Sequence, residues 1–152
     1  MMIKVSFNVD EPFWAKEMPL FKKSILKATK ETLNTACEVK QNSLEVNFLL
    51  TSDSNIKSLN KNYRNKDKST NVLAFPMNQN TNSESYTVGD IAISLQKILS
   101  ESKKLRIQKY KYLSKITIHG VLHLLGFDHK SNKQYDEMNK IEKRVFEKIF
   151  YK

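Results

Sequence analysis

Hydrophobic residues recur along this chain with two different periods, one typical of strands and the other of helices. Alternation of apolar and polar positions predicts strands in IKVSFNVD, SLEVNFLLT, TNVLAFPM and TVGDIAIS, which span residues 3–10, 43–51, 70–77 and 87–94. Helical spacing predicts helices over residues 14–36, over a short segment after residue 51, and over residues 95–104, 107–125 and 131–150. This succession predicts an α+β fold, in which a mixed sheet of roughly four strands is covered by about five helices.

Individual residues at the segment boundaries refine this prediction. Pro76 has no backbone N–H, so its strand lies at a sheet edge or ends there. Gly126 follows the third of the long helices and suits the left-handed conformation that ends a helix. Ser131 and Gln134 form a capping box for the last helix. The polar segment NQNTNSES, residues 78–85, is predicted to be an exposed loop.

The composition is that of a single globular domain spanning residues 1–152. Hydrophobic residues make up 39% of the chain and charged residues 28%, which excludes an intrinsically disordered protein. No apolar run approaches the ~20 residues of a membrane span, and the N-terminal sequence lacks the apolar centre of a signal peptide. Cys37 is the only cysteine, which excludes an intramolecular disulfide. We therefore expect a cytoplasmic protein without a membrane partner.

The net charge of +10 is concentrated in two segments. Residues 57–68 carry five basic side chains and one acidic side chain, and residues 97–115 carry seven basic and one acidic. Elsewhere the basic and acidic residues are equal in number. A concentrated basic surface attracts polyanions, nucleic acid first. Charge alone leaves open the alternative of an ordinary solvated, lysine-rich surface.

All three histidines lie within HGVLHLLGFDH, residues 119–129. His119 and His123 are four residues apart, so a helix presents them on one face, where two imidazoles can chelate one metal ion. If the chain turns back after Gly126, His129 approaches the same point. Three imidazoles with one open position are typical of a catalytic zinc site, whereas a structural site takes a fourth protein ligand. The alternative is three ordinary histidines in a helix and its exit turn.

The residue after the first histidine argues against one reaction. Zinc proteases of the HExxH type have Glu at that position as the general base. Here the position is Gly120, which cannot accept a proton. The segment therefore has the metal-binding helix of a zincin without the protease's base, and peptide hydrolysis by that route is disfavoured.

Three segments together resemble one known family. HGVLHLLGFDH is similar to the HGxLHLxGYDH signature of the YbeY family of ribosomal RNA maturation endoribonucleases. LNKNYRNKDKSTNVLAFP, which precedes the polar loop, and GDIAIS, which follows it, also resemble family segments, so the likeness covers nearly the whole chain. Phe127 stands where the family usually has Tyr, and Asn71 and Ala74 replace the commoner Asp and Ser. None of these differences removes a metal ligand.

The resemblance implies a metal-dependent endoribonuclease that prefers single strands, matures ribosomal RNA and acts in ribosome quality control, with ribosomal RNA and the small ribosomal subunit as its partners. It implies one zinc ion held by His119, His123 and His129, no organic cofactor, and a functionally required arginine at Arg64. A guanidinium matches phosphate geometry and opposes the charge that develops during phosphoryl transfer. The alternative for Arg64 is an ion pair with Asp67. A metalloprotease-like hydrolase and a non-catalytic, zinc-stabilised ribosome-assembly factor are the competing interpretations of the whole chain.

Further polar residues near these motifs are candidates for supporting roles. Asp128 either orients a ligand imidazole or caps the turn in which it lies. Asp90, at the expected start of a strand, either approaches the site or satisfies a turn. Basic side chains that flank Arg64 or precede the metal helix are candidates for binding the RNA backbone. They are Lys61, Lys66, Lys68, Lys103, Lys104, Arg106, Lys109 and Lys111.

Overall fold

The computed structural model describes residues 2–38, 42–80 and 85–151. In chain order its elements are β1 (Met2–Val9), α1 (Phe13–Glu17), α2 (Phe21–Ala36), β2 (Ser43–Thr51), α3 (Asp53–Arg64), β3 (Val72–Asn80), β4 (Ser85–Ser94), α4 (Leu95–Leu105), α5 (Lys109–Leu124) and α6 (Asn132–Phe150). The predicted α+β class with a four-stranded mixed sheet is confirmed.

The strands form one sheet in the order β1–β2–β4–β3. β2 pairs in parallel with both β1 and β4, whereas β3 runs antiparallel to β4. Pro76 therefore lies in an edge strand, as predicted, and the register of β3 against β4 shifts just after it. β2 has the predicted bounds, whereas β3 and β4 are longer than predicted. Both ends of the expected loop at 78–85 belong to β3 and β4, and residues 81–84 lie outside the described residues.

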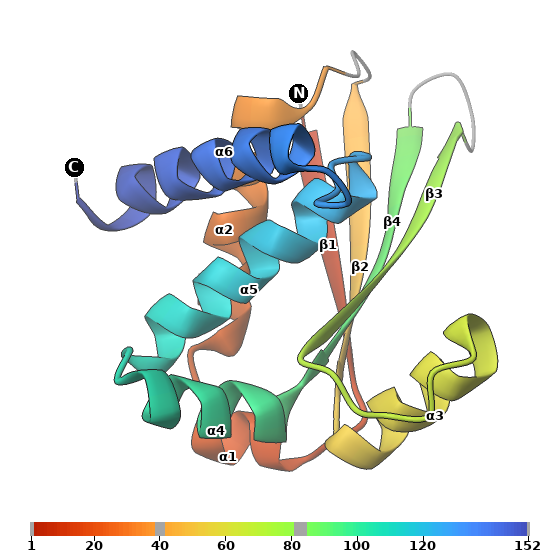
Figure 1. Cartoon of the computed structure of the whole chain (residues 1–152), viewed down its shortest axis with the longest axis vertical. Helices are drawn as coiled ribbons and strands as arrows, with labels where there is room; N and C mark the ends of the chain where they lie inside the picture. Colours follow the sequence, from red (N-terminus) through yellow and green to blue (C-terminus); the bar gives the residue numbers. More distant parts are fainter. Residues whose placement is uncertain (1, 39–41, 81–84, 152) are drawn as a thin grey trace.

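The helices cover the two faces of the sheet unequally (Figure 1). α1, α2, α4 and α5 enclose the main core on one face, where Trp14, Ile25, Val46, Ile91 and Val121 are buried. α6 packs on α2 and α5 in a second cluster outside this layer. Among the described residues, the opposite face is contacted at one end alone, by α3. No helix in the described part of the chain is long and apolar enough to cross a membrane.

The helix predicted over residues 14–36 is in fact two helices, α1 and α2. Pro19 causes the break, because proline lacks an N–H and disfavours helical geometry in the residue before it. Accordingly, Met18 has φ −138° and ψ 67°. Trp14, Met18 and Phe21 are all buried, so the apolar spacing continues across the break. A periodicity argument therefore could not detect it.

α5 is buried on nearly all sides. Between Lys111 and Leu124, every residue is buried except those at positions 111, 115, 119 and 123. Gly120 allows the helix to lie close to the sheet, since a Cβ there would stand 3.2 Å from Cγ2 of Val72. The helix thus keeps one accessible stripe, with a residue at every fourth position, and two of the three histidines lie on it.

Candidate metal centre

His119, His123 and His129 converge on one point. The Nε2 atoms of His119 and His123 lie 3.0 Å apart, and one ring nitrogen from each of the three residues lies within 4.8 Å of the others. The first two histidines occupy successive turns of α5, and His129 lies in the connection between α5 and α6. The structure therefore brings together the three residues that the sequence pattern singled out.

The turn that returns His129 to the helix is a Schellman motif. Gly126 has φ +96°, which is the left-handed conformation predicted for it. The N–H of Gly126 donates to the carbonyl of His123, and the N–H of Phe127 donates to that of Leu122, both at 3.1 Å. Phe127 also packs against the cluster that contains Leu122. Local sequence therefore reverses the chain within a few residues of the helical histidine pair.

The nitrogen atoms of this cluster suit a zinc ion. Zn–N bonds of about 2.0–2.1 Å place two ligand nitrogens of a tetrahedral ion about 3.3 Å apart, close to the spacing of the helical pair. Burial lowers the pKa of His123, and the neighbouring His119 and His129 lower it further, so its lone pair is available at neutral pH. No fourth His, Cys, Asp or Glu of the described residues joins the cluster.

Glu142 of α6 completes the surroundings of the cluster and was not predicted. Its Oε1 lies 2.5 Å from Nδ1 of His119, and its side chain is only 18% exposed. A carboxylate that accepts the Nδ1–H of an imidazole holds the other nitrogen, Nε2, as the metal-binding lone pair. Glu142 lies on the same side of α6 as the buried Met138 and Val145. The sequence signal that could have revealed Glu142 was an acidic residue at helical spacing between the apolar residues Met138 and Val145.

We expect Glu142→Ala to weaken zinc binding about 10–100-fold, the usual effect of losing such a partner. The physical reason is that the His119 ring loses its fixed tautomer and orientation. Zinc affinity would be measured by competition with a chromophoric chelator. Glu147→Ala removes an exposed carboxylate from the same helix and is the control. Equal affinities of the two variants would show that Glu142 does not position the ligand.

Arg64, the last residue of α3, shares a pocket of about 620 Å³ with the three histidines. Its Nη2 donates to the carbonyl of Ala74 at 2.7 Å, and its Cζ lies 5.7 Å from the ring centroid of Phe75. Both contacts are to β3, so the guanidinium is held on the wall of the pocket contributed by that strand. The alternative ion pair between Arg64 and Asp67 does not form. Oδ1 of Asp67 lies 4.0 Å from Nζ of Lys57 instead.

The two aspartates that the sequence suggested for supporting roles lie in different places. Oδ1 of Asp128 accepts the N–H of His129 at 2.7 Å, and this hydrogen bond is the main cause of its lowered pKa. Asp128 therefore caps its turn, and no imidazole bonds to it among the described residues. Asp90 lies within β4, on the face covered by α3, where Oδ1 accepts from Nδ2 of Asn47 at 2.9 Å. Both predicted roles for Asp90 were wrong, because strand alternation turns it away from the histidines.

The basic candidates separate into groups. Lys66 lines the metal pocket, together with Lys130, which the sequence pattern did not single out. Arg106 and Lys111 line a second groove, between α5 and α6. Lys109 donates to a backbone carbonyl of α1 at 2.6 Å. The candidates that line neither cavity are Lys61, Lys68, Lys103, Lys104 and Lys109.

Similarity to known proteins extends over most of the chain. The family model described as Endoribonuclease YbeY matches residues 13–150. The Endoribonuclease YbeY of Pelagibacter ubique is 35% identical, and the match covers 97% of this chain and 97% of the relative. The Endoribonuclease YbeY of Bartonella quintana is 31% identical, and the match covers 97% of this chain and 94% of the relative. That of Buchnera aphidicola is 41% identical over 97 residues, which are 64% of this chain and 63% of the relative.

A solved structure shares the fold. The solution structure of TM1509 from Thermotoga maritima matches with a TM-score of 0.58 and 25% identity, over 98% of this chain and 89% of that one. The range that the family model matches, residues 13–150, contains the whole segment from Arg64 to His129. This chain therefore belongs to the endoribonuclease YbeY family.

Proposed function

We propose that this protein is a metal-dependent endoribonuclease, in which His119, His123 and His129 hold a zinc ion and Arg64 acts on the phosphate of the RNA. The observation that carries the proposal is the convergence of three imidazoles in one pocket with an anchored guanidinium. Relatives named Endoribonuclease YbeY support the reaction class. Three protein ligands with an open position are the arrangement of catalytic zinc.

The proposed substrate is single-stranded ribosomal RNA, cut during its maturation and during ribosome quality control, and the proposed partner is the small ribosomal subunit. The sequence resemblance to the family supports this choice, and the basic residues around the pocket favour a polyanion. The proposed location is the cytoplasm, where this substrate would be processed. We further propose that residues 1–152 act as one catalytic domain, since α3, which carries Arg64, and α5, which carries His119 and His123, pack on a single sheet.

The proposed roles of the side chains follow from their positions. A bound zinc ion would supply Lewis acidity and lower the pKa of water. Arg64 would contact non-bridging phosphate oxygens. Its Nη2 donates to the carbonyl of Ala74, and the other N–H groups of the guanidinium would be the donors to a phosphate in the pocket that Arg64 lines. Lys66 and Lys130 add positive charge at the rim. Glu142 would hold the His119 ring in its ligand orientation.

The competing interpretations fit this geometry less well. A protease of the HExxH type would need Glu in place of Gly120, whose Cβ position is already 3.2–3.3 Å from side-chain atoms of Val72 and Ile91. A purely structural zinc site usually has a fourth protein ligand, and none is provided by the described residues. Catalysis on RNA therefore agrees best with the site.

Purified protein is expected to cut single-stranded ribosomal RNA fragments and to leave a denatured protein substrate intact. Chelation should abolish cutting, and added zinc should restore it, because the metal supplies the Lewis acid. Gel analysis of labelled RNA and of the protein substrate provides both measurements. The proposal would be wrong if RNA remained intact with zinc-loaded protein, or if the protein substrate were cut instead.

A further inference from the structure

The accessible stripe of α5 continues beyond the metal centre. The four residues that are not buried between Lys111 and Leu124 are, in order, Lys111, Lys115, His119 and His123. Residues four apart lie on one side of a helix, so the two lysines precede the two histidines along a single line. At a rise of 1.5 Å per residue this line is about 18 Å long.

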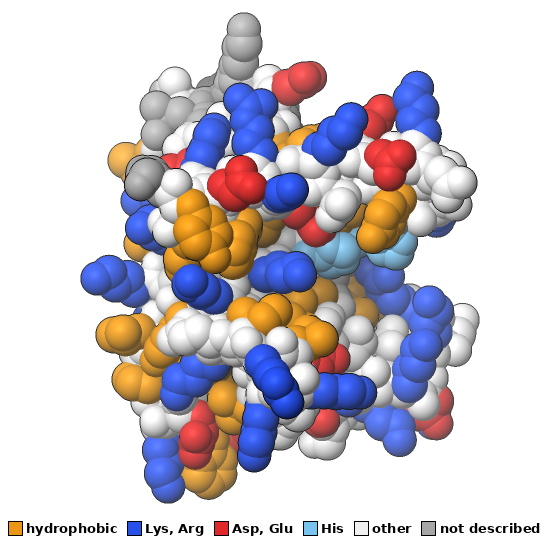
Figure 2. Space-filling view, turned by 60° about the vertical axis from the view of Figure 1, so that its left-hand side comes forward, with side chains coloured by type: hydrophobic (Ala, Val, Ile, Leu, Met, Phe, Trp, Pro, Cys, Tyr) orange, Lys and Arg blue, Asp and Glu red, His pale blue; other side chains and the backbone are white. Residues whose placement is uncertain are grey.

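A groove follows the lysine end of this stripe. It has a volume of about 530 Å³ and lies between the start of α5 and the facing side of α6. Figure 1 shows why it exists: the two helices meet near the end of α5 and diverge towards its beginning. Figure 2 shows a hollow across this side of the molecule, with the histidines at its right-hand end.

The groove has a strong excess of positive charge. Four basic side chains line it, Arg106, Lys111, Lys115 and Lys143. The only acidic side chain among its lining residues is Glu142, whose carboxylate is occupied by His119 of the metal centre. The groove and the metal pocket are therefore adjacent, and Glu142 and His119 form the boundary between them.

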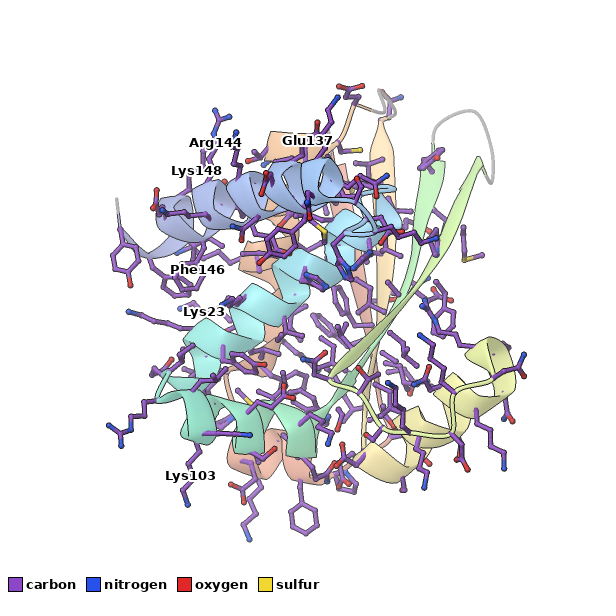
Figure 3. All side chains as sticks on the ribbon, in the orientation of Figure 1. Lys23, Lys103, Glu137, Arg144, Phe146 and Lys148 are labelled. Atoms are coloured by element: carbon purple, nitrogen blue, oxygen red, sulfur yellow. The ribbon has the colours of Figure 1, made fainter. Side chains whose placement is uncertain are left out.

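Aromatic rings form the other part of the groove. Phe146 and Tyr151 line it, with ring centroids 6.1 Å apart, and Tyr151 is 65% exposed. The ammonium of Lys111 lies 5.2 Å from the centroid of the Tyr151 ring. Figure 3 shows Phe146 on the side of α6 towards α5, whereas Arg144 points to the opposite side.

We infer that this groove binds the single-stranded RNA that extends from the scissile bond at the metal centre. The inference rests on the proposed function and adds the path of the substrate. Basic side chains that follow the backbone, with aromatic rings on which unpaired bases stack, are the general features of single-strand binding grooves. A length of about 18 Å accommodates about five nucleotides at a stacked rise of ~3.4 Å. Lys115 and Lys143 contact phosphates, and Tyr151 stacks on a base.

The test compares two double variants of the zinc-loaded protein. K115A/K143A removes two charges from the groove. K140A/R144A removes two charges from the part of α6 outside the groove, since neither residue lines it and both are exposed. Fluorescence anisotropy measures binding of a labelled 12-nucleotide 2′-O-methyl RNA, shown by gel to remain uncut, at several salt concentrations. Cleavage of the unmodified RNA by wild-type protein is measured in parallel.

Two lost phosphate contacts are expected to reduce the salt slope of log K by about 1.4 and to weaken binding about 25-fold at 0.1 M salt. The control double variant should lose less than about threefold, because its charges act only at a distance. Tyr151→Ala should weaken binding at least about fivefold and leave the salt slope unchanged, since it removes stacking alone.

Three results would overturn the inference. They are wild-type affinity in K115A/K143A, an equal loss in both double variants, and displacement of the RNA by poly-glutamate of equal charge, which would indicate an acidic protein partner. If wild-type protein binds this RNA through the groove but cuts no unmodified RNA, the proposed reaction fails while the binding path stands.

Discussion

His123→Ala is expected to lower RNA cleavage by about three orders of magnitude, the effect of losing several kcal/mol of metal-derived stabilisation of the transition state. The imidazole is one of only three nitrogen donors in the cluster, and its Nε2 is the one facing His119 at 3.0 Å. Two remaining donors hold zinc weakly, so the variant should also lose its metal. Initial cleavage rates and zinc content by elemental analysis check the two parts of this result.

The fold of the His123→Ala variant should be retained. His123 is only partly buried, it belongs to no hydrophobic cluster of the described residues, and Ala is the best helix former. Circular dichroism and the thermal unfolding midpoint of the zinc-free proteins provide the control. Unchanged cleavage by a folded, zinc-free variant, purified alongside a mock preparation, would point to a contaminating nuclease and contradict the proposed enzyme.

Arg64→Ala is expected to retain zinc and lose cleavage by about 100- to 1000-fold, the range observed when one preorganised donor to a developing charge is removed. Arg64 lies outside the cluster of metal ligands, so zinc affinity should not change. Its Nη2 donates to the carbonyl of Ala74, which holds the guanidinium at the pocket that Arg64 lines with the three histidines. Single-turnover rates at saturating zinc measure the loss.

Two further variants separate the chemistry of Arg64 from its charge. Arg64→Lys keeps the charge but loses bidentate geometry, so it should recover only a small part of the rate. Lys57→Ala removes an exposed charge from the same helix and should cleave almost as wild type. Should Arg64→Ala cleave as fast as Lys57→Ala, Arg64 would be a structural residue that fastens the end of α3 to β3.

The site was predictable from the sequence where its geometry is local. His119 and His123 face one way because a helix brings residues four apart to the same side. His129 approaches them because Gly126 adopts the left-handed conformation that ends α5. All of these relations lie within eleven residues of chain, so backbone periodicity and one turn motif were enough to predict them.

The same reasoning failed where position depends on distant elements. Asp90 belongs to β4, and the helix that carries His119 and His123 packs on one face of the sheet. Alternation along the strand turns the Asp90 side chain to the opposite face. Lys103 and Lys111 belong to one basic segment, but only Lys111 lines the groove beside the metal centre. The net charge of a segment does not tell where each of its side chains points or which residues each side chain contacts.

The pattern of residues along the chain was enough to predict most of the elements and the convergence of the three histidines, because both depend on residues close together in the chain, although it missed the break between α1 and α2. Pro76 indicated an edge strand because proline lacks the backbone N–H that a central strand needs. The tertiary structure alone decided that Glu142 supports His119, that Arg64 faces the same pocket, and that α6 diverges from α5 to leave a basic groove. These features depend on how α3, α5 and α6 pack across the sheet and each other. Packing of that kind is set by many side chains together, and no single segment encodes it.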